Sequence, residues 1–237
     1  MSPDEPAMSL IEHLEELRHR LIVIVAAVVL GAVAGFVLSQ PALDVLIAPL
    51  PAGFDKLYFT GVADAFTVRL KVAVFVGVAI AMPIILFQVW RFITPGLTSR
   101  ERRLVWPLLL AALGLFALGL GVGYVVIPYA LGFLLSLAEP GRVEPLLTIS
   151  EYIGFVTTMM LAFGLVMEFP IVLVALARVG ILNHRAVAAR RRQVIVGIVL
   201  FAVVITPGGD PFSPSILAAV MYVLFEASLV VMRLVRR

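Results

Sequence analysis

Long apolar runs recur along this chain and constrain its fold more than any other feature. A run of about 20 apolar residues spans a bilayer as a helix. The composition agrees, since 62% of the residues are hydrophobic and only 14% are charged, against about a quarter charged in soluble domains. We therefore predict an all-α, polytopic membrane protein that forms one membrane domain over 1–237. Its six transmembrane helices are expected at about 21–39, 68–92, 104–127, 152–182, 193–206 and 215–232.

The fifth of these segments is unusually short. Between Arg192 and Pro207 there is room for about 14 residues, or ~21 Å of helix, against a hydrocarbon core of about 30 Å. We expect the fifth and sixth helices to form a short hairpin that either thins the bilayer or stops before its far face. Of the prolines in the longer helices, Pro83 is expected to kink the second helix and Pro128 to end the third.

The basic residues are distributed along the chain in a way that predicts its orientation. Fourteen of the eighteen Lys and Arg residues fall at Arg18–Arg20, Arg91–Arg103, Arg178–Arg192 and Arg233–Arg237. Cytoplasmic loops of membrane proteins hold the excess of Lys and Arg, so we expect both ends in the cytoplasm (N-in/C-in) and an even number of spans. These clusters flank apolar spans and form no basic face of their own. We therefore expect the chain to lie in a lipid bilayer and not to bind nucleic acid.

Several helix starts are marked in the sequence. The segments Ser9–Glu12, Thr98–Glu101 and Thr148–Glu151 each place a hydroxyl three residues before a carboxylate, the spacing of a capping box. Ser213–Pro214 resembles an N-cap residue followed by proline in the first turn. A cap is therefore one explanation for the acidic residue Glu101.

The segment 9–20, ahead of the first span, is amphipathic, with leucines on one face and charged residues on the other. One interpretation is an interfacial helix stabilised by the pairs Glu16–Arg20 and Glu15–His19 at i,i+4 spacing. The alternative is a carboxylate offered to a basic ligand at the cytoplasmic surface. A second acidic residue, Glu101, lies on the same predicted side of the membrane, in the strongly basic loop that follows the second span.

Five motifs in register resemble those of the TatC family, the large subunit of the twin-arginine translocase. His13–Arg20 is similar to its H-L-x-E-L-R signature, and Phe87–Arg102 resembles the motif that follows its second helix. Met167–Pro170 resembles the family's F-E-x-P. Thr206–Ser213 and Leu224–Glu226 resemble its last hairpin. The resemblance runs in order over nearly the whole chain and implies a concave helical bundle in the bacterial cytoplasmic (inner) membrane.

The resemblance implies a receptor for signal peptides that carry two consecutive arginines. Arginine pairs with carboxylates in bidentate, charge-assisted geometry, so acidic residues are the expected partners. Glu101 matches the primary family position and Glu16 the second. The supporting residues implied for signal-peptide binding are Arg18, Gln88, Phe92, Pro95 and Arg102.

Three further positions are candidates for a role inside or outside the membrane. An ionisable residue within a span is a functional candidate by default, so Glu168, beside Pro170, is predicted either to contact lipid or a partner helix, or to stabilise packing near a helix break. Pro49 and Asp210 match positions in the family's periplasmic loops, although Pro49 could equally be a plain turn.

The sequence predicts no enzyme, no cofactor and no metal site. It lacks Cys, and it lacks the P-loop, zinc-protease and nucleophile-elbow motifs. The resemblance implies export of folded precursor proteins driven by the proton gradient, together with single-span TatA- and TatB-type subunits, in a complex with several copies of the chain. Short apolar helices 193–206 and 215–232 are the expected docking surface. The alternatives are a small-solute secondary transporter, which would require inverted repeats, and a membrane scaffold without transport.

Overall fold

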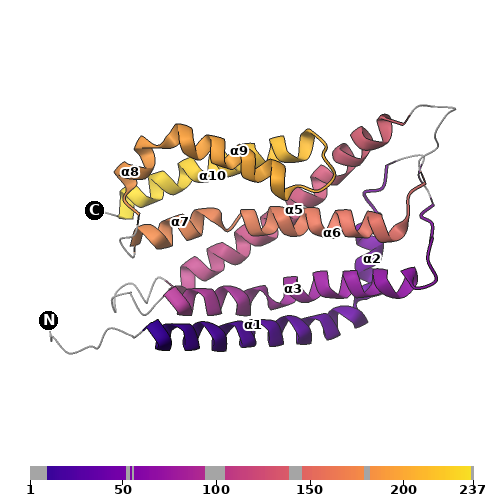
Figure 1. Ribbon diagram of the computed structural model, residues 1–237, viewed down its shortest axis with the longest axis horizontal. Helices are drawn as coiled ribbons and strands as arrows, with labels where there is room; N and C mark the ends of the chain where they lie inside the picture. The colour runs from indigo at the N-terminus through magenta and orange to yellow at the C-terminus, as the bar shows by residue number, and fades with distance from the viewer. Residues whose placement is uncertain are drawn as a thin grey trace.

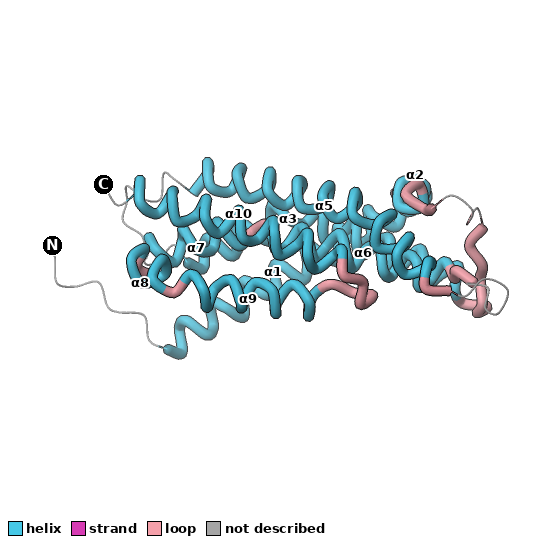
Figure 2. The backbone as a smooth tube through the Cα atoms, turned by 90° about the horizontal axis from the view of Figure 1, so that it is seen from above, coloured by secondary structure: helices cyan, strands magenta, loops and turns pink. Residues whose placement is uncertain are grey.

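The structure is a computed structural model that describes residues 10–51, 54, 56–93, 105–138, 146–178 and 182–235. Over these residues the chain is helical, with loops at the ends of the helices (Figures 1 and 2). The helices are α1 (Leu10–Val37), α2 (Ser39–Ile47), α3 (Asp64–Ile93), α5 (Val105–Ser136), α6 (Ile149–Val166), α7 (Phe169–Arg178), α8 (His184–Ala189), α9 (Arg191–Ile205) and α10 (Phe212–Val235).

Five helical stretches are long and apolar enough to cross a membrane. They are Ile11–Val37, Asp64–Phe92, Trp106–Ser136, Ile149–Ala177 and Phe212–Arg233. The predicted fifth segment forms α9, whose 15 residues give a length of ~22 Å. In Figure 1 the turn between α9 and α10 stops well before the end of the molecule that α3 and α5 reach. Helix α9 is therefore short as the sequence predicts, whereas α10, with 24 residues, is longer than the predicted 215–232.

The end predicted for the third helix is wrong. Helix α5 continues through Pro128 to Ser136, so it is longer than the predicted 104–127. Proline costs the helix one backbone hydrogen bond. The apolar run continues after Pro128, and neighbouring helices in membrane proteins commonly compensate for such a loss. Helix α3 likewise continues through Pro83 to Ile93.

The predicted fourth helix, 152–182, is divided in two. Helix α6 ends at Val166 and α7 begins at Phe169, with a turn at Met167 and Glu168 between them. Pro170 thus lies in the first turn of α7, where its missing N–H is not needed. The chain stays in line across the turn because the carbonyl of Glu168 accepts from the N–H groups of Ile171 and Val172, each at 3.1 Å.

The N-terminal amphipathic segment is not a separate interfacial helix. It is continuous with the first span, and together they form α1. Helix α1 packs along α3, where Gly31 and Gly35 approach the backbone of Gly77 and Ala73. Gly119 and Gly123 of α5 meet α6 in the same way, so the G-x-x-x-G segments of both α1 and α5 lie at helix contacts.

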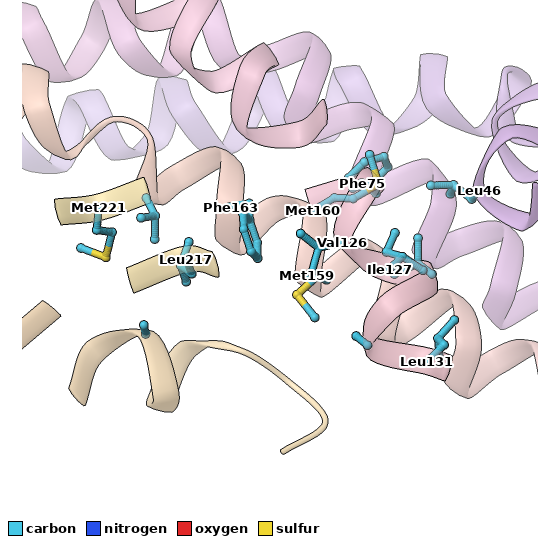
Figure 3. Close-up of a cluster of buried hydrophobic side chains, with 14 of the residues drawn as sticks. Leu46, Phe75, Val126, Ile127, Leu131, Met159, Met160, Phe163, Leu217 and Met221 are labelled. Carbon is cyan, nitrogen blue, oxygen red and sulfur yellow. The ribbon is translucent and has the colours of Figure 1, made fainter. Parts of the chain in front are cut away.

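The largest buried cluster lies where α3, α5, α6 and α10 meet. Helix α6 contributes most to it, including the fully buried Phe163 and Met159, which Figure 3 shows beside Leu217 of α10 and Ile127 of α5. By contrast, α1 leaves most of its apolar side chains exposed, as expected for a helix whose outer face meets lipid. Helix α6 is thus the central element around which the other spans are arranged.

The predicted helix caps are partly confirmed. Thr148 accepts a hydrogen bond from the N–H of Glu151 at 3.4 Å and begins α6 as predicted. Ser213 is not the N-cap of the last helix, because α10 already begins at Phe212. Asp210 caps that helix instead, since its Oδ1 accepts from the N–H of Ser213 at 2.7 Å.

Candidate functional site

The predicted peptide-binding residues that the structure describes lie at one end of the molecule, where α1 begins and α3 ends. Glu16 and Arg18 belong to the second turn of α1, and Gln88 and Phe92 to the last turns of α3. The start of α1 and the end of α10 lie at this same end, together with α8 (Figure 1). The close packing of α1 on α3 brings these two distant segments together.

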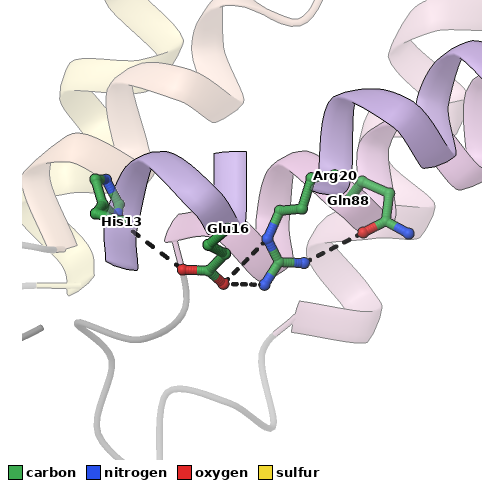
Figure 4. Close-up of polar contacts among 4 residues, drawn as sticks. All are labelled: His13, Glu16, Arg20 and Gln88. Carbon is green, nitrogen blue, oxygen red and sulfur yellow. Dashed lines mark hydrogen bonds and ion pairs between the residues drawn. The ribbon is translucent and has the colours of Figure 1, made fainter. Parts of the chain in front are cut away.

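Glu16 forms an ion pair with Arg20 one turn later in α1, as the sequence predicts (Figure 4). Two nitrogens of the Arg20 guanidinium contact the same carboxylate oxygen, Oε1, and the Nε distance is 3.1 Å. The third guanidinium nitrogen donates to Oε1 of Gln88 at 3.2 Å. Arg20 therefore links the carboxylate of α1 to α3.

The other carboxylate oxygen of Glu16, Oε2, differs from Oε1 in its contacts. Oε2 is buried and has no hydrogen-bond partner among the described residues. The nearest cationic group is Nδ1 of His13, 3.9 Å away, which is too far for a hydrogen bond. His13 in turn stacks on Phe92 with ring centroids 4.5 Å apart and an interplanar angle of 21°. The result is a part-buried acceptor flanked by two stacked rings.

The remaining predicted peptide-binding residues fall into two groups. Arg18 is exposed on α1. Pro95, Glu101 and Arg102 lie outside the described residues. The structure thus brings Glu16, Gln88 and Phe92 together and leaves the expected partnership of Glu16 with Glu101 as a prediction.

Two residues of this site were not among the predicted binding residues. His13 is in the N-terminal motif, but nothing in the sequence pairs it with Phe92, 79 positions later. Arg20 was expected to pair with Glu16 only as a surface pair, whereas it is buried, with a relative exposure of 9%. The contact of Arg20 with Gln88 depends on how the two helices pack, so no local sequence signal could have identified it.

Glu168 lies at the turn between α6 and α7, inside a segment long and apolar enough to cross the membrane. Its side chain is buried, and Oε1 has no hydrogen-bond partner in the part of the chain that the structure describes. Pro170 is also buried. A buried carboxyl oxygen without a partner is costly, so the role predicted for Glu168 from the sequence stays a prediction.

Pro49 and Asp210 both lie in connections between helices, away from Glu16. Pro49 follows α2 in a turn. Two tyrosines from neighbouring helices donate hydrogen bonds to α2, which precedes Pro49. The hydroxyl of Tyr124 in α5 donates to the carbonyl of Val45 at 2.9 Å. The hydroxyl of Tyr152 in α6 donates to the carbonyl of Leu46 at 2.9 Å. Asp210 is buried and caps α10. The structure gives Asp210 a structural task that the motif alone did not indicate.

The last hairpin carries one ion pair and one apolar pocket. Arg191, at the start of α9, contacts Oε2 of Glu226 in α10 at 2.9 Å. The pocket opens beside α9 and is lined by Phe169, Val194, Gly197, Ile198, Phe201 and Met221. Over the described ranges, no three His, Asp or Glu side chains gather in a way that could hold a metal ion.

Comparison with known proteins places these features in one family. The family described as Sec-independent protein translocase protein (TatC) matches residues 12–219. A TatC protein of Carboxydothermus hydrogenoformans is 34% identical over 234 residues, which cover 98% of this chain and 96% of the relative. One of Synechocystis is 37% identical over 233 residues, covering 98% and 91%. A crystal structure of the twin-arginine translocase receptor TatC matches with a TM-score of 0.79 at 35% identity, covering 95% of this chain and 100% of that one. This chain is a multi-pass protein of the bacterial inner membrane and belongs to the TatC family of Sec-independent protein translocase proteins.

Proposed function

We propose that this chain is the receptor subunit that recognises twin-arginine signal peptides at the cytoplasmic face of the membrane. The observation that carries the proposal is the carboxylate of Glu16, part-buried at the end of the molecule with one oxygen lacking a hydrogen-bond partner among the described residues. A guanidinium is the natural ligand for such an acceptor. Each charge-assisted hydrogen bond contributes about 1.5–3 kcal/mol.

In this proposal Glu101 makes the primary contact to the arginine pair and Glu16 the second. Gln88 contacts Arg20 and Phe92 stacks on His13, so α3 supports the site through the two neighbours of Glu16. Arg18, Pro95 and Arg102 are assigned supporting roles on the strength of the family motifs alone. Two carboxylates facing one ligand explain why two consecutive arginines are required, because each guanidinium needs a separate anion.

The proposed topology is six spans in one membrane domain, with both ends in the cytoplasm. Five helices have the length and apolarity to cross, and α9 is the short sixth member. The gathering of basic residues at the end that carries Glu16 favours this orientation. With six helices the chain is too small to enclose a pore for folded proteins, so export requires partners.

We propose that these partners are TatA- and TatB-type single-span subunits, and that the complex contains several copies of this chain. The proton gradient is the proposed energy source. The apolar pocket beside α9 supports a helix-docking surface on the last hairpin. Glu168 is proposed as a polar site inside the membrane, where an ionisable group is expected to serve a partner or the transport step.

The test is site-specific crosslinking of a twin-arginine precursor to the full-length protein in membranes, with the photoreactive residue next to position 101. We expect Glu101→Ala and Glu16→Gln each to weaken crosslinking by about tenfold or more, the equivalent of one lost charge-assisted bond. The matched control is Glu15→Gln, which removes the same charge from the exposed neighbour of Glu16 and should crosslink normally. Unchanged binding in a Glu16/Glu101 double variant would rule out the receptor.

A further inference from the structure

The apolar pocket beside α9 lies between the last hairpin and α7. Phe169 of α7, Met221 of α10 and residues of α9 line it, and all of them are apolar. Its volume is about 310 Å³, near the lower end of the range of about 300–1,000 Å³ for ligand pockets. Phe201 in its wall is 46% exposed, so the pocket is open to the surrounding bilayer. A Cβ atom added to Gly197 would meet nothing within 4 Å, so the space beside this residue is unfilled by protein.

The pocket follows one face of α9 and leads to the basic start of that helix. Four residues share this face, with spacings of four, three and four positions: Arg190, Val194, Gly197 and Phe201. The last three line the pocket, and Arg190 directly precedes the first residue of α9. From Arg190 to Phe201 the helix rises by ~17 Å. Half of a hydrocarbon core of about 30 Å is ~15 Å, so the face matches the depth of one leaflet.

The start of α9 carries more positive charge than neighbouring carboxylates neutralise. Arg185 in α8, Arg190 and Arg192 are exposed, and none of them pairs with a carboxylate of a described residue. Arg191 does pair, with Oε2 of Glu226 at 2.9 Å. Clusters of arginine at a membrane surface attract anionic lipids, and basic pockets between membrane helices bind their headgroups.

We propose that this pocket binds an acyl chain of a phospholipid with an anionic headgroup, and that the headgroup lies at Arg190 and the start of α9. The chain supplies the dispersion contacts that an unfilled apolar wall lacks, and the arginines attract the negative charge. A zwitterionic lipid offers the same chain without a net charge, so it binds more weakly. The inference uses only the pocket and the charges beside it, and it holds whichever side of the membrane this end faces.

A lipid in the pocket leaves the last hairpin with a surface for a partner helix. Val196, Leu200 and Val203 are exposed, and their spacings of four and three positions place them on a face of α9 that does not line the pocket. The single-span subunits of the proposed function can therefore dock on α9 without displacing the lipid. The arginines favour a lipid as the occupant of the pocket itself, because an apolar transmembrane helix would not use their charge.

The test is photolabelling of the purified full-length protein in liposomes. Two probes carry the same diazirine-bearing acyl chain and differ in the headgroup, which is phosphatidylglycerol in one and phosphatidylcholine in the other. Mass spectrometry measures the label at Phe169 and Met221, divided by the label on the exposed apolar side chains of α1, which meet bulk lipid. We expect this ratio to be about tenfold higher for phosphatidylglycerol, since each arginine near a headgroup contributes about fivefold.

A charge variant tests the part assigned to the headgroup. Arg190→Gln should lower the ratio for phosphatidylglycerol by about fivefold and leave the ratio for phosphatidylcholine unchanged. The matched control, Arg91→Gln, removes the same charge from an exposed position at the end of α3. It should leave both ratios at the wild-type value.

A second variant tests the part assigned to the acyl chain. Gly197→Leu places a side chain in the unfilled space without meeting backbone, and should lower the label at Phe169 and Met221 to the level of α1 for both probes. The matched control is Gly121→Leu in α5, where an added Cβ also meets nothing within 4 Å. That variant should keep the wild-type ratios.

Three results would overturn the inference. Equal ratios for the two probes in the wild type would remove the anionic preference, and an unchanged label in Gly197→Leu would show that the chain lies elsewhere. Labelling is repeated in native membranes that contain the single-span subunits, where loss of the pocket label would assign the pocket to a partner helix. None of these results depends on Glu16, so the receptor proposal stands or fails separately.

Discussion

Some buried polar side chains in this protein form hydrogen bonds within their own helix, and others have atoms without a hydrogen-bond partner among the described residues. Thr157 and Ser228 donate to the carbonyls four residues earlier, at 2.6 and 2.7 Å, as hydroxyls in apolar helices commonly do. Within the described ranges, the buried side-chain atoms without a partner are Oε2 of Glu16, Oε1 of Glu168, Oδ2 of Asp210, Oγ of Ser213 and Oε1 of Glu226. All five residues fall in the segments that resemble the motifs of the family, and a buried polar atom without a partner calls for an explanation.

Glu168 is the acid among them that lies deepest in a span. Two substitutions can separate the effect of its carboxyl group from the effect of its side-chain size. Glu168→Gln keeps the size and hydrogen-bonding capacity, whereas Glu168→Ala removes both. We expect export of a twin-arginine reporter to fall about tenfold or more in Glu168→Ala and to be partly retained in Glu168→Gln, because a polar group at this depth serves function. The control is Glu151→Gln, at an exposed acid at the start of α6. Normal export by both Glu168 variants would make the residue a packing element.

Asp210 is expected to contribute to stability through its cap on α10. Removing the acceptor in Asp210→Ala leaves the N–H of Ser213 without its side-chain partner and should cost about 1 kcal/mol, in a range of about 0.5–2 kcal/mol. For a chain of this size the melting temperature falls by about 2–4 °C per kcal/mol. Asp210→Asn keeps an oxygen acceptor and should melt close to the wild type. Equal melting of the Ala variant and the wild type in detergent would contradict the capping role.

The candidate site was only partly predictable at the level of residues. The motif identified Glu16, and helical spacing predicted its pair with Arg20. The link from Arg20 to Gln88, 68 positions later, was not predictable, because it depends on the register of α1 against α3. The sequence favoured Ser213 as the cap of α10, whereas the acceptor lies three residues earlier on Asp210. Both Ser and Asp are favoured cap residues, so residue type alone does not decide between them.

At the scale of helices, the register of α1 on α3 is set by glycines. A Cβ atom added to Gly77 would lie 2.4 Å from the backbone nitrogen of Ala32, and one added to Gly31 would lie 2.5 Å from the carbonyl oxygen of Gly77. Backbone atoms cannot move aside as a flexible side chain can. The two helices therefore approach closely only because both residues lack a side chain.

We expect Gly77→Ala to separate α1 from α3 and to destabilise the protein by about 1–3 kcal/mol, the usual cost of overpacking. Because the separation also pulls Arg20 away from Gln88, binding of twin-arginine peptides should weaken in the same variant. The matched control is Gly114→Ala in α5, where an added Cβ meets nothing within 4 Å, so alanine should be neutral or slightly stabilising. Thermal unfolding of the two variants checks the difference. Equal melting temperatures would show that the helices yield without cost.

Helix boundaries were predictable where an apolar run ends and uncertain where a proline interrupts it. The short α9 followed directly from the spacing of Arg192 and Pro207. Pro128 was expected to end a helix and does not, whereas near Pro170 the helix breaks at the preceding turn. The sequence around a proline does not show whether neighbouring helices satisfy the freed backbone groups, and this decides between continuation and break.

At the scale of the whole molecule, basic residues gather at one end. Arg18 lies near the start of α1, Arg91 near the end of α3, Arg185 in α8 and Arg233 near the end of α10. Figure 1 shows these parts at the same end of the molecule. The opposite end holds the loop before α3, with Val62 fully exposed. From this arrangement the positive-inside rule predicts that Glu16 faces the cytosol.

Cysteine labelling tests this orientation without background, because the chain has no native cysteine. We expect Val62→Cys to react with a membrane-impermeant maleimide in intact spheroplasts, and Ala189→Cys, exposed at the end of α8, to react only after the membrane is opened. The reason is that translocating the arginine-rich end would cost far more than translocating the loop at Val62. Labelling of Ala189→Cys in intact spheroplasts would place Glu16 outside the cytosol, where it could not meet a signal peptide before export.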